Sequence, residues 1–220
     1  MAEPAPTKEQ QSENIAPATF RPQMICSGGQ TGADRGALIA AAILGYEHGG
    51  WVPKGRLAED GKVPRCYPMT EADTADYPTR TILNIECSNA TAVFTYEDPA
   101  TGGTKLTLRK AQEAKKPVIH IVLQPKDTLE GNLLIAKRLR AWIDEVEPRV
   151  LNVAGSRESK APGLQTQVAE VMLLTLQTPD TCLCGRKIPS SIWETAGVKE
   201  TNIPLKCSEC GHITLWTDFQ

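Results

Sequence analysis

The chain has 220 residues, of which 40% are hydrophobic, so it can bury a core, and its length favours one main domain with a small addition. The longest apolar stretch, around Leu38 to Leu44, falls well short of the roughly 18 to 20 residues that a membrane span requires, which excludes a transmembrane helix. A formal net charge of −2, spread in short clusters, argues against a dedicated nucleic-acid binder, which needs a basic face.

The first residues and the cysteines indicate where the protein works. Residues 1–20 are rich in Pro, Gln, Glu and Ala and have neither the basic nor the apolar region of a secretion signal, so we expect a disordered tail there. Seven cysteines without such a signal indicate the cytoplasm, a reducing compartment where clustered thiols bind metals more often than they form disulfides. Cys26, Cys66 and Cys87 are isolated in the sequence, and we expect structural or bystander thiols.

Residues 21–178 alternate short β-branched runs with longer helical ones, a pattern typical of parallel strands joined by right-handed helical crossovers. This predicts one Rossmann-like α/β domain whose open, mainly parallel sheet is flanked by helices. Residues 51–78 are dense in Pro, Gly and charge, and we interpret them as a functional loop. In chain order, we predict strand 22–26, helix 33–44, strand 46–50, helix 77–88, strand 91–95, helix 104–115, strand 117–123, helix 129–146, strand 149–154 and helix 164–176.

A glycine-rich turn joins the first predicted strand to the first predicted helix, with the sequence Cys26-Ser-Gly-Gly-Gln-Thr-Gly-Ala-Asp34. Glycines let a ligand approach the backbone, and a helix start offers unpaired N–H groups with a partial positive charge. We therefore interpret the turn as an anion cradle, with Asp34 as a candidate cap of the helix. The turn lacks the Lys-Ser/Thr ending of a P-loop and the G-x-G-x-x-G spacing of dinucleotide folds, which disfavours ATP hydrolysis and NAD chemistry.

A second turn repeats this arrangement. Thr101-Gly-Gly-Thr-Lys105 follows a predicted strand and opens a helix, with Arg109 one turn beyond Lys105. Because the carboxyl ends of parallel strands share one edge of a sheet, both turns should face one crevice. Either turn alone is compatible with a tight connection that has no functional role. The pair at matching positions indicates phosphate binding.

Several motifs resemble one family when they are taken together and in order. They are Ser27-Gly-Gly-Gln-Thr-Gly-Ala-Asp-Arg35, His48-Gly-Gly-Trp-Val-Pro-Lys-Gly-Arg56, Ala58-Glu-Asp60, Arg80-Thr81 with Asn84, Thr101-Gly-Gly-Thr104, and Leu151-Asn-Val-Ala-Gly-Ser-Arg-Glu-Ser159 with Pro162-Gly163. Through them, residues 24–175 resemble the molybdenum cofactor carrier family. The resemblance implies a Rossmann-like fold of the lysine-decarboxylase-like and DNA-processing-protein-A-like group, which is often oligomeric, and a bound pterin phosphate.

A pterin phosphate is anionic and has a hydrogen-bonding ring edge, so backbone amides, Lys and Arg side chains and directional polar groups suit it. A ring of His48 or Trp51 would stack on a flat ligand, although simple packing is the alternative for both. Glu59 and Asp60 are also compatible with solvated loop positions, and Asn152, in an apolar strand, needs hydrogen-bond partners. The predicted ligand-binding residues are Gly28, Gly29, Gln30, Thr31, Gly32, Asp34, Arg35, His48, Trp51, Lys54, Arg56, Arg80, Thr101, Gly102, Gly103, Thr104, Asn152, Ser156, Arg157 and Ser159.

The second turn also bears on catalysis. Related cytokinin-activating phosphoribohydrolases carry a P-G-G-x-G-T loop with a glutamate close behind it, whereas here no carboxylate follows Gly102-Gly103-Thr104 before Glu113. The sequence suggests no Ser-His-Asp or Cys-His set. We therefore predict a binding protein without turnover, in the first place a molybdenum cofactor carrier or storage protein. A nucleotide-processing or nucleotide-sensing domain is the alternative.

Four cysteines near the end of the chain form two turn-like pairs, Cys182-Leu-Cys184-Gly185 and Cys207-Ser-Glu-Cys210-Gly211. Such pairs bind tetrahedral zinc when they meet across a hairpin. We therefore predict a zinc-ribbon-like module over residues 179–220 with these four cysteines as ligands. The first pair is one residue shorter than C-x-x-C, and His212 is an alternative ligand. With little positive charge nearby, we expect the module to contact a protein partner or another copy of the chain.

Overall fold

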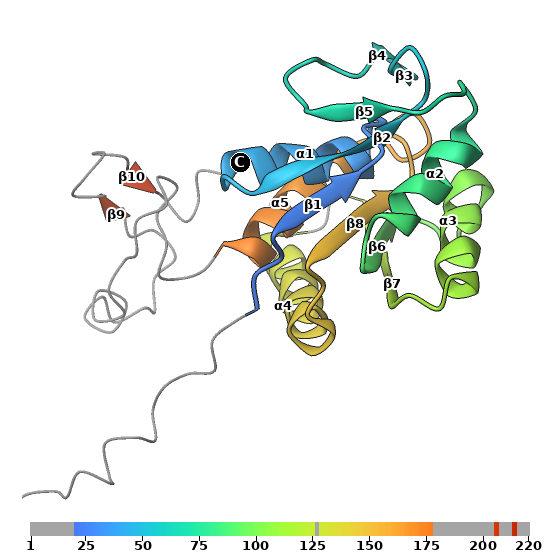
Figure 1. The fold of residues 1–220 in the computed structure, drawn as a ribbon. Coiled ribbons are helices and arrows are strands. Elements are labelled where there is room, and N and C mark those ends of the chain that lie inside the picture. The colour runs from blue at the N-terminus through green and yellow to red at the C-terminus, as the bar shows by residue number, and fades with distance from the viewer. Residues whose placement is uncertain (1–19, 126–127, 178–204, 207–212, 215–220) are drawn as a thin grey trace, which may run out of the picture.

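The computed structural model describes residues 20–125, 128–177, 205–206 and 213–214. Its centre is a six-stranded sheet in the order β5-β2-β1-β8-β6-β7 (Figure 1). Every neighbouring pair of strands in this sheet is parallel, which confirms the predicted Rossmann-like α/β class. The strands are β1 (Met24–Ser27), β2 (Glu47–Val52), β5 (Met69–Glu71), β6 (Ala90–Thr95), β7 (Val118–Val122) and β8 (Val150–Gly155).

Helices cover both faces of the sheet (Figure 1). On one face, α1 (Ala33–Ile43) and α4 (Leu129–Val146) both pack against α5 (Leu164–Leu176). On the other face, α2 (Tyr77–Glu86) packs against α3 (Gly102–Glu113). The two layers follow from right-handed crossovers that run in opposite directions along the sheet.

The core lies between the sheet and the α1, α4 and α5 layer. Ile25, Phe94, Leu151 and Met172 are among its fully buried side chains, and burying a side chain of this size stabilises the fold by about 1.5 to 3 kcal/mol. The helices approach closely where residues are small. A Cβ atom on Gly36 would lie 2.4 Å from the carbonyl oxygen of Gln165, so glycine allows α1 to rest directly on α5.

The ends of the helices follow local sequence signals. α2 begins after Asp76, whose carboxylate accepts a hydrogen bond from the backbone N–H of Thr79 at 2.9 Å. At the other end of α2, the Lys116 ammonium donates to the carbonyl oxygens of Ile85, Glu86 and Ser88 at 2.6 to 2.8 Å. These bonds satisfy carbonyls that a helix end leaves unpaired and place a cation where the helix dipole favours it.

Residues 51–78 contain more structure than we predicted. β2 continues through Trp51 and Val52, and β5 adds a parallel edge strand in which Trp51 pairs with Thr70. Between them, β3 (Leu57–Ala58) and β4 (Gly61–Lys62) form an antiparallel hairpin. We call residues 53–68 the excursion. Its strands are too short to produce a periodic pattern in the sequence.

The C-terminal region is described only at β9 (Leu205–Lys206) and β10 (Ile213–Thr214), which pair antiparallel. Cys182, Cys184, Cys207, Cys210 and His212 lie outside the described residues. Within the described ranges, no three Cys, His, Asp or Glu side chains gather as a metal site would require. The zinc-ribbon-like module and its boundary near residue 179 therefore stay predictions from the sequence.

Candidate functional site

A cavity of about 460 Å³, a volume suited to a small molecule, opens at the carboxyl edge of the sheet. It is bounded by α2 and by the segments that follow β1, β6 and β8, three adjacent strands in the order β1-β8-β6. Ligands of open α/β sheets bind at this kind of edge. The lining residues are Gln30, Asp34, Tyr77, Arg80, Thr81, Glu97, Thr101, Gly102, Gly103, Thr104, Thr107, Ala154, Gly155, Ser156, Arg157 and Lys160.

Both glycine-rich turns reach this cavity, but they contribute different groups. The first turn supplies the side chains of Gln30 and Asp34, whereas the second supplies Thr101 and the helix start at Gly102 and Gly103. The two turns thus lie on the same edge of the sheet and face one crevice. Of the other predicted residues, Arg80, Thr104, Ser156 and Arg157 also line the cavity.

A buried ion pair forms one wall of the cavity. Arg80 Nη1 lies 3.0 Å from Asp34 Oδ2, and the two side chains are 12% and 4% exposed. Burial raises the pKa of Asp34, and the positive charge of Arg80 opposes this effect. Gly28 makes room for the pair, because a Cβ atom there would fall 1.4 Å from Arg80 Nη1. Asp34 does not cap α1 as we expected, since the N-cap residue is Gly32 and Asp34 accepts a bond from Gln30 N instead.

Gln30 presents an unpaired donor. Its side-chain oxygen accepts hydrogen bonds from the backbone N–H groups of Thr31 at 3.1 Å and Glu59 at 2.8 Å. These two bonds fix the orientation of the amide, because only the oxygen can accept. Its Nε2 atom is buried and has no hydrogen-bond partner within the described part of the chain, as is also true of Arg80 Nε. Buried donors of this kind normally have partners, and both side chains line the cavity.

The start of α3 offers backbone donors to the same cavity. Thr101 is the N-cap residue, but its hydroxyl donates to Glu97 Oε2 at 3.2 Å and does not cap the helix. The backbone N–H groups of Gly102, Gly103 and Thr104 accordingly find no acceptor in residues 20–125 or 128–177. Neither glycine would bring a Cβ atom within 4 Å of another group, so the space in front of this helix start is open. Helix starts of this kind attract anions.

Two further cations stand at the rim. The guanidinium carbon of Arg157 lies 5.8 Å from the centre of the Tyr77 ring. Its Nε atom lies 3.9 Å from Glu59 Oε2. Lys160 lines the cavity one turn further along the chain. Glu97 adds a carboxylate to the cavity lining. The cavity therefore combines cations, helix-start amides and an unpaired amide donor with a single carboxylate besides the paired Asp34.

Sequence reasoning missed Tyr77, Thr81, Glu97, Thr107, Ala154, Gly155 and Lys160 as lining residues. Their position in the fold was a usable signal for two of them, since Glu97 follows β6 and Gly155 ends β8 at the carboxyl edge. Gly155 also meets a steric demand, because its Cβ atom would lie 2.0 Å from the carbonyl oxygen of Phe94. Glu113, the first carboxylate after the second turn, pairs with Lys110 at the far end of α3 and does not line the cavity.

Other predicted residues of the first turn hold the loops together. Arg35 donates to the carbonyl oxygen of Gly29 at 3.1 and 3.2 Å and to Asp60 at 3.0 and 3.3 Å. Gly32 has φ +78°, and a Cβ atom there would lie 2.3 Å from the carbonyl oxygen of Ser156. These contacts fasten the turn to the excursion and to the loop after β8 without lining the cavity.

Glu59 of the excursion bridges the same loops. Its carboxylate accepts hydrogen bonds from the Thr31 hydroxyl and from the backbone N–H of Ser159 at 3.0 Å. Thr31 and Ser159, both predicted to bind ligand, are thus engaged by Glu59 and lie outside the cavity lining. The Arg35–Asp60 and Glu59 contacts together hold the hairpin β3-β4 against the first turn.

The structure does not bring the remaining predicted residues to the cavity. Arg56 has φ 56° and donates to the carbonyl oxygens of Val63, Pro64, Tyr67 and Met69, which stabilises the excursion. Lys54 is exposed. The backbone N–H and carbonyl of Trp51 are both bonded by the Asn84 side chain at 2.7 and 2.9 Å. Asn152 is buried in β8, where its Nδ2 donates to Thr91 Oγ1 at 3.2 Å.

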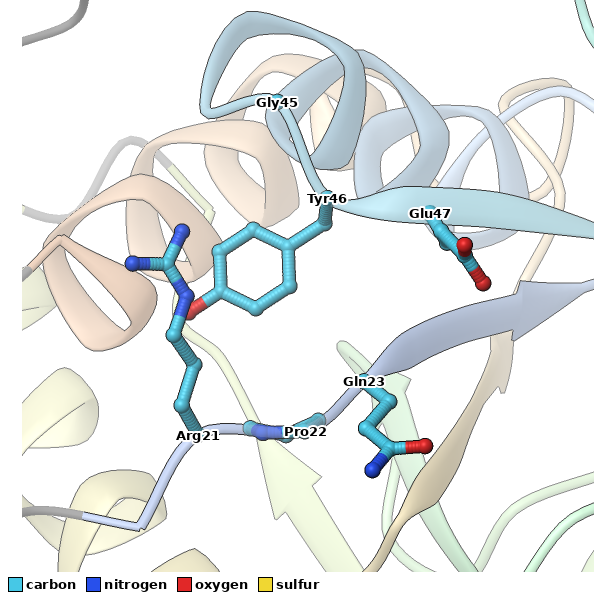
Figure 2. A pocket seen from close by; sticks show the side chains of 6 residues that line it. All are labelled: Arg21, Pro22, Gln23, Gly45, Tyr46 and Glu47. Carbon is cyan, nitrogen blue, oxygen red and sulfur yellow. The ribbon is translucent and has the colours of Figure 1, made fainter. Parts of the chain in front are cut away.

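A second hollow lies at the opposite edge of the sheet, where β1 and β2 begin. Figure 2 shows its six lining residues, and the Arg21 guanidinium stands 4.3 Å from the centre of the Tyr46 ring. The Tyr46 hydroxyl donates to the carbonyl oxygen of Leu176 at 3.1 Å, so the end of α5 lies here as well. His48 belongs to this edge, since its Nδ1 lies 2.9 Å from the carbonyl oxygen of Tyr46. The amino edge of the sheet is not where α/β folds bind their ligands.

Comparison with known proteins identifies the family. Residues 25–176 match the model of the circularly permutated YpsA SLOG family. The chain belongs to this family. No curated protein matches the chain. Among the described residues, no helix is both long and apolar enough to cross a membrane.

A solved structure agrees with this assignment to the circularly permutated YpsA SLOG family. It is a crystal structure from Syntrophus aciditrophicus SB described as "Putative molybdenum carrier protein". The sequences are 37% identical, the match covers 72% of this chain and 97% of the other, and the TM-score is 0.67. The family resemblance predicted from the motifs is therefore confirmed for the α/β domain.

Proposed function

We propose that the cavity at the carboxyl edge binds a phosphorylated pterin or a nucleotide-like small molecule, and that the protein carries or stores this ligand. Molybdenum cofactor is the first candidate. The observation that carries the proposal is the meeting of the unpaired backbone N–H groups at Gly102 and Gly103 with the unpaired Gln30 Nε2 donor in one cavity. An anionic head group would accept hydrogen bonds from the Gly102 and Gly103 N–H groups, and an acceptor on a ring edge would accept one from Gln30 Nε2.

The charges around the cavity support an anionic ligand. Arg80 is already paired with Asp34, so it adds little net positive charge to the cavity. Its contribution is a directional hydrogen-bond donor, the Nε atom that has no partner among the described residues. Arg157, which faces Glu59 at 3.9 Å, and Lys160 are exposed at the rim, where they add positive charge. Glu97 accepts hydrogen bonds, which suits an amino group of a pterin or a hydroxyl of a ribose.

The solved relative supports the carrier role over other uses of the fold. That protein is named as a molybdenum carrier, and its sequence is 37% identical to this chain. Fold alone does not determine function, so the assignment here depends on the cavity and on that relative together. If molybdenum cofactor is the cargo, Gly102 and Gly103 would hold its phosphate and Gln30 its ring edge, while the metal would supply redox chemistry only after transfer to an enzyme.

Native mass spectrometry of freshly purified full-length protein tests the proposal. We expect a mass increment that corresponds to a phosphorylated pterin or nucleotide, together with molybdenum in an elemental analysis of the same sample. The proposal is overturned if the protein carries no small molecule and also fails to bind added nucleoside monophosphates and reduced pterin phosphates.

A nucleotide-processing activity is the second candidate, and the carboxylate of Glu97 in the cavity favours it. Cleavage of an N-glycosidic bond needs a carboxylate near the sugar. Incubation with nucleoside monophosphates separates the two candidates. Released base that disappears in Glu97→Gln indicates hydrolysis, whereas intact nucleotide supports binding without turnover.

We also propose that Cys182, Cys184, Cys207 and Cys210 bind one structural zinc ion, with His212 as the alternative ligand. Paired thiolates followed by glycine support this proposal. We further propose that the resulting module docks a protein partner or a second copy of the chain, because the family resemblance implies oligomers. Size-exclusion chromatography with light scattering, on the full chain and on a chain ending at residue 178, tests the oligomer.

A further inference from the structure

Two cysteines that the proposed ligand site does not use lie side by side. Cys26 Sγ in β1 is 3.6 Å from Cys87 Sγ, the residue that follows α2. Sixty positions of sequence separate them, so the fold and not the local chain brings them together. Cys26 is completely buried, whereas Cys87 is exposed. One thiol is therefore accessible to reagents, and its neighbour is shielded from them.

The surroundings of the pair divide the roles of the two sulfur atoms. The pKa of Cys87 is lowered to about 7 by the hydrogen bond from the Cys26 thiol and by the nearby Lys116 ammonium. Burial and the charge of Glu86 oppose this effect. The pKa of Cys26 is raised by the contact with Cys87, by burial and by the charge of Asp34, whereas the charge of Arg80 lowers it. Lys116 is fixed by the three carbonyl oxygens around Cys87, from Ile85, Glu86 and Ser88. Cys87 is thus the nucleophile and Cys26 the protonated partner.

We propose that Cys87 and Cys26 form a peroxide-sensitive dithiol that closes to an intramolecular disulfide. The Cys87 thiolate attacks one oxygen of a peroxide, the O–O bond breaks, and Cys87 becomes a sulfenic acid. The hydroxide or alkoxide that leaves takes a proton from solvent to give water or an alcohol. The Cys26 sulfur then attacks the Cys87 sulfur, its proton leaves with the hydroxyl as water, and the S–S bond forms. The two thiols lose two electrons, which the peroxide accepts.

The geometry supports closure of this bond. A disulfide has an S–S distance of about 2.05 Å, so the sulfur atoms must approach by only about 1.5 Å. Closure also removes the Cys26 thiol proton, for which Asn84 Oδ1 at 3.2 Å is a second acceptor besides the Cys87 sulfur. Asn84 holds β2 through Trp51, and Arg80 lies one turn earlier on the same helix. Oxidation would thus act on the helix that carries one wall of the cavity.

Peptide mapping of the full-length protein tests the proposal. Trypsin cleaves after Arg35, Arg65 and Arg80, which places Cys26, Cys66 and Cys87 in three different peptides. After treatment with hydrogen peroxide and blocking of free thiols, we expect a peptide pair joined through Cys26 and Cys87 and lighter by two hydrogen atoms. Dithiothreitol should release the pair. Cys66, exposed and isolated, serves as the internal control.

Two variants separate the roles of the sulfur atoms. In Cys87→Ser, the change is at the surface, and we expect oxidation of Cys26 to fall by about tenfold or more because the accessible nucleophile is gone. In Cys26→Ser, we expect Cys87 to proceed to sulfinic acid because no thiol resolves the sulfenic acid. Thermal melts of both reduced variants establish that they fold. The proposal is overturned if Cys87 joins Cys66 or a C-terminal cysteine, or if both thiols stay free or oxidise separately.

Discussion

The ion pair between Asp34 and Arg80 shows how single residues shape the cavity. The pair needs Gly28, because any side chain there would occupy the position of the Arg80 guanidinium. It also leaves Arg80 Nε without a hydrogen-bond partner among the described residues, and the Arg80 side chain lines the cavity. Asp34 is largely neutralised by Arg80, so a buried carboxylate and an anionic ligand are compatible in one site.

The pH dependence of stability tests the state of Asp34. Burial raises its pKa, so the folded protein binds this proton more readily than the unfolded chain does. The contribution of Asp34 to stability therefore falls as pH rises from the ordinary carboxyl pKa through the raised one. Asp34→Asn lacks this dependence. In urea unfolding between acidic and neutral pH, the free energy of unfolding of the wild type minus that of Asp34→Asn should decrease as pH rises. An increase would mean that Arg80 controls Asp34 more than burial does.

The start of α3 is the element on which the proposed anion binding would depend most. Its first amides have no acceptor among the described residues, and the space around Gly102 and Gly103 is open. α1 contributes less than the sequence indicated, since the N–H of its first residue, Ala33, donates to the carbonyl oxygen of Ser156 at 3.1 Å. We therefore expect one helix start, assisted by Gln30, to take the anion-binding role that we had divided between two.

Substitution of Gly103 tests this role. Gly103→Asp should fold normally, because its Cβ atom meets no group and an acidic residue in the first turn suits the helix dipole. It should weaken ligand binding by about tenfold or more through repulsion between like charges. Gly103→Ala, the matched neutral variant, should retain most of the affinity. Isothermal titration with the ligand identified by mass spectrometry provides the comparison, and equal affinities in both variants would exclude an anion at this helix start.

The longer elements could be predicted from the sequence, whereas several side-chain roles could not. The helices over 129–146 and 164–176 agree with the prediction at both ends, because each repeats its apolar positions at helical spacing. The strand β5 was missed because three residues in a proline-rich segment produce no pattern. Lys54 and Arg56 looked like cations that bind the ligand, but the path of a long loop decides where such side chains point. Arg56 instead donates to three carbonyl oxygens of its own excursion and to that of Met69 in β5.

Across the whole molecule, the two edges of the sheet carry different features. The cavity with its donors lies at the carboxyl edge, and the hollow beside Arg21 and Tyr46 lies at the amino edge, together with the end of α5 (Figure 2). Helix α5 therefore ends at the edge opposite to the cavity, and the four cysteines follow it in the sequence. We infer that the proposed zinc site and the proposed ligand site are separate.

Metal removal tests this separation. Purified protein should contain about one zinc ion per chain, which a chelator or a Cys207→Ser, Cys210→Ser double variant removes. A module of this size has too little core to fold alone, so proteolysis of residues 179–220 should accelerate without metal. The unfolding transition of the α/β domain and its ligand affinity should not change. Zinc that persists in the double variant, or a domain that unfolds with the chelator, would contradict this organisation.

NMR spectroscopy of the ¹⁵N-labelled protein during titration with its phosphorylated ligand tests the central claim most directly. The account predicts that the largest shifts occur at the backbone amides of Gly102, Gly103 and Thr104 and at the side-chain NH₂ of Gln30. Amides around Tyr46 and His48, at the amino edge, should stay unchanged. Shifts that gather around Tyr46 and His48 while those of Gly102, Gly103 and Gln30 stay still would contradict it.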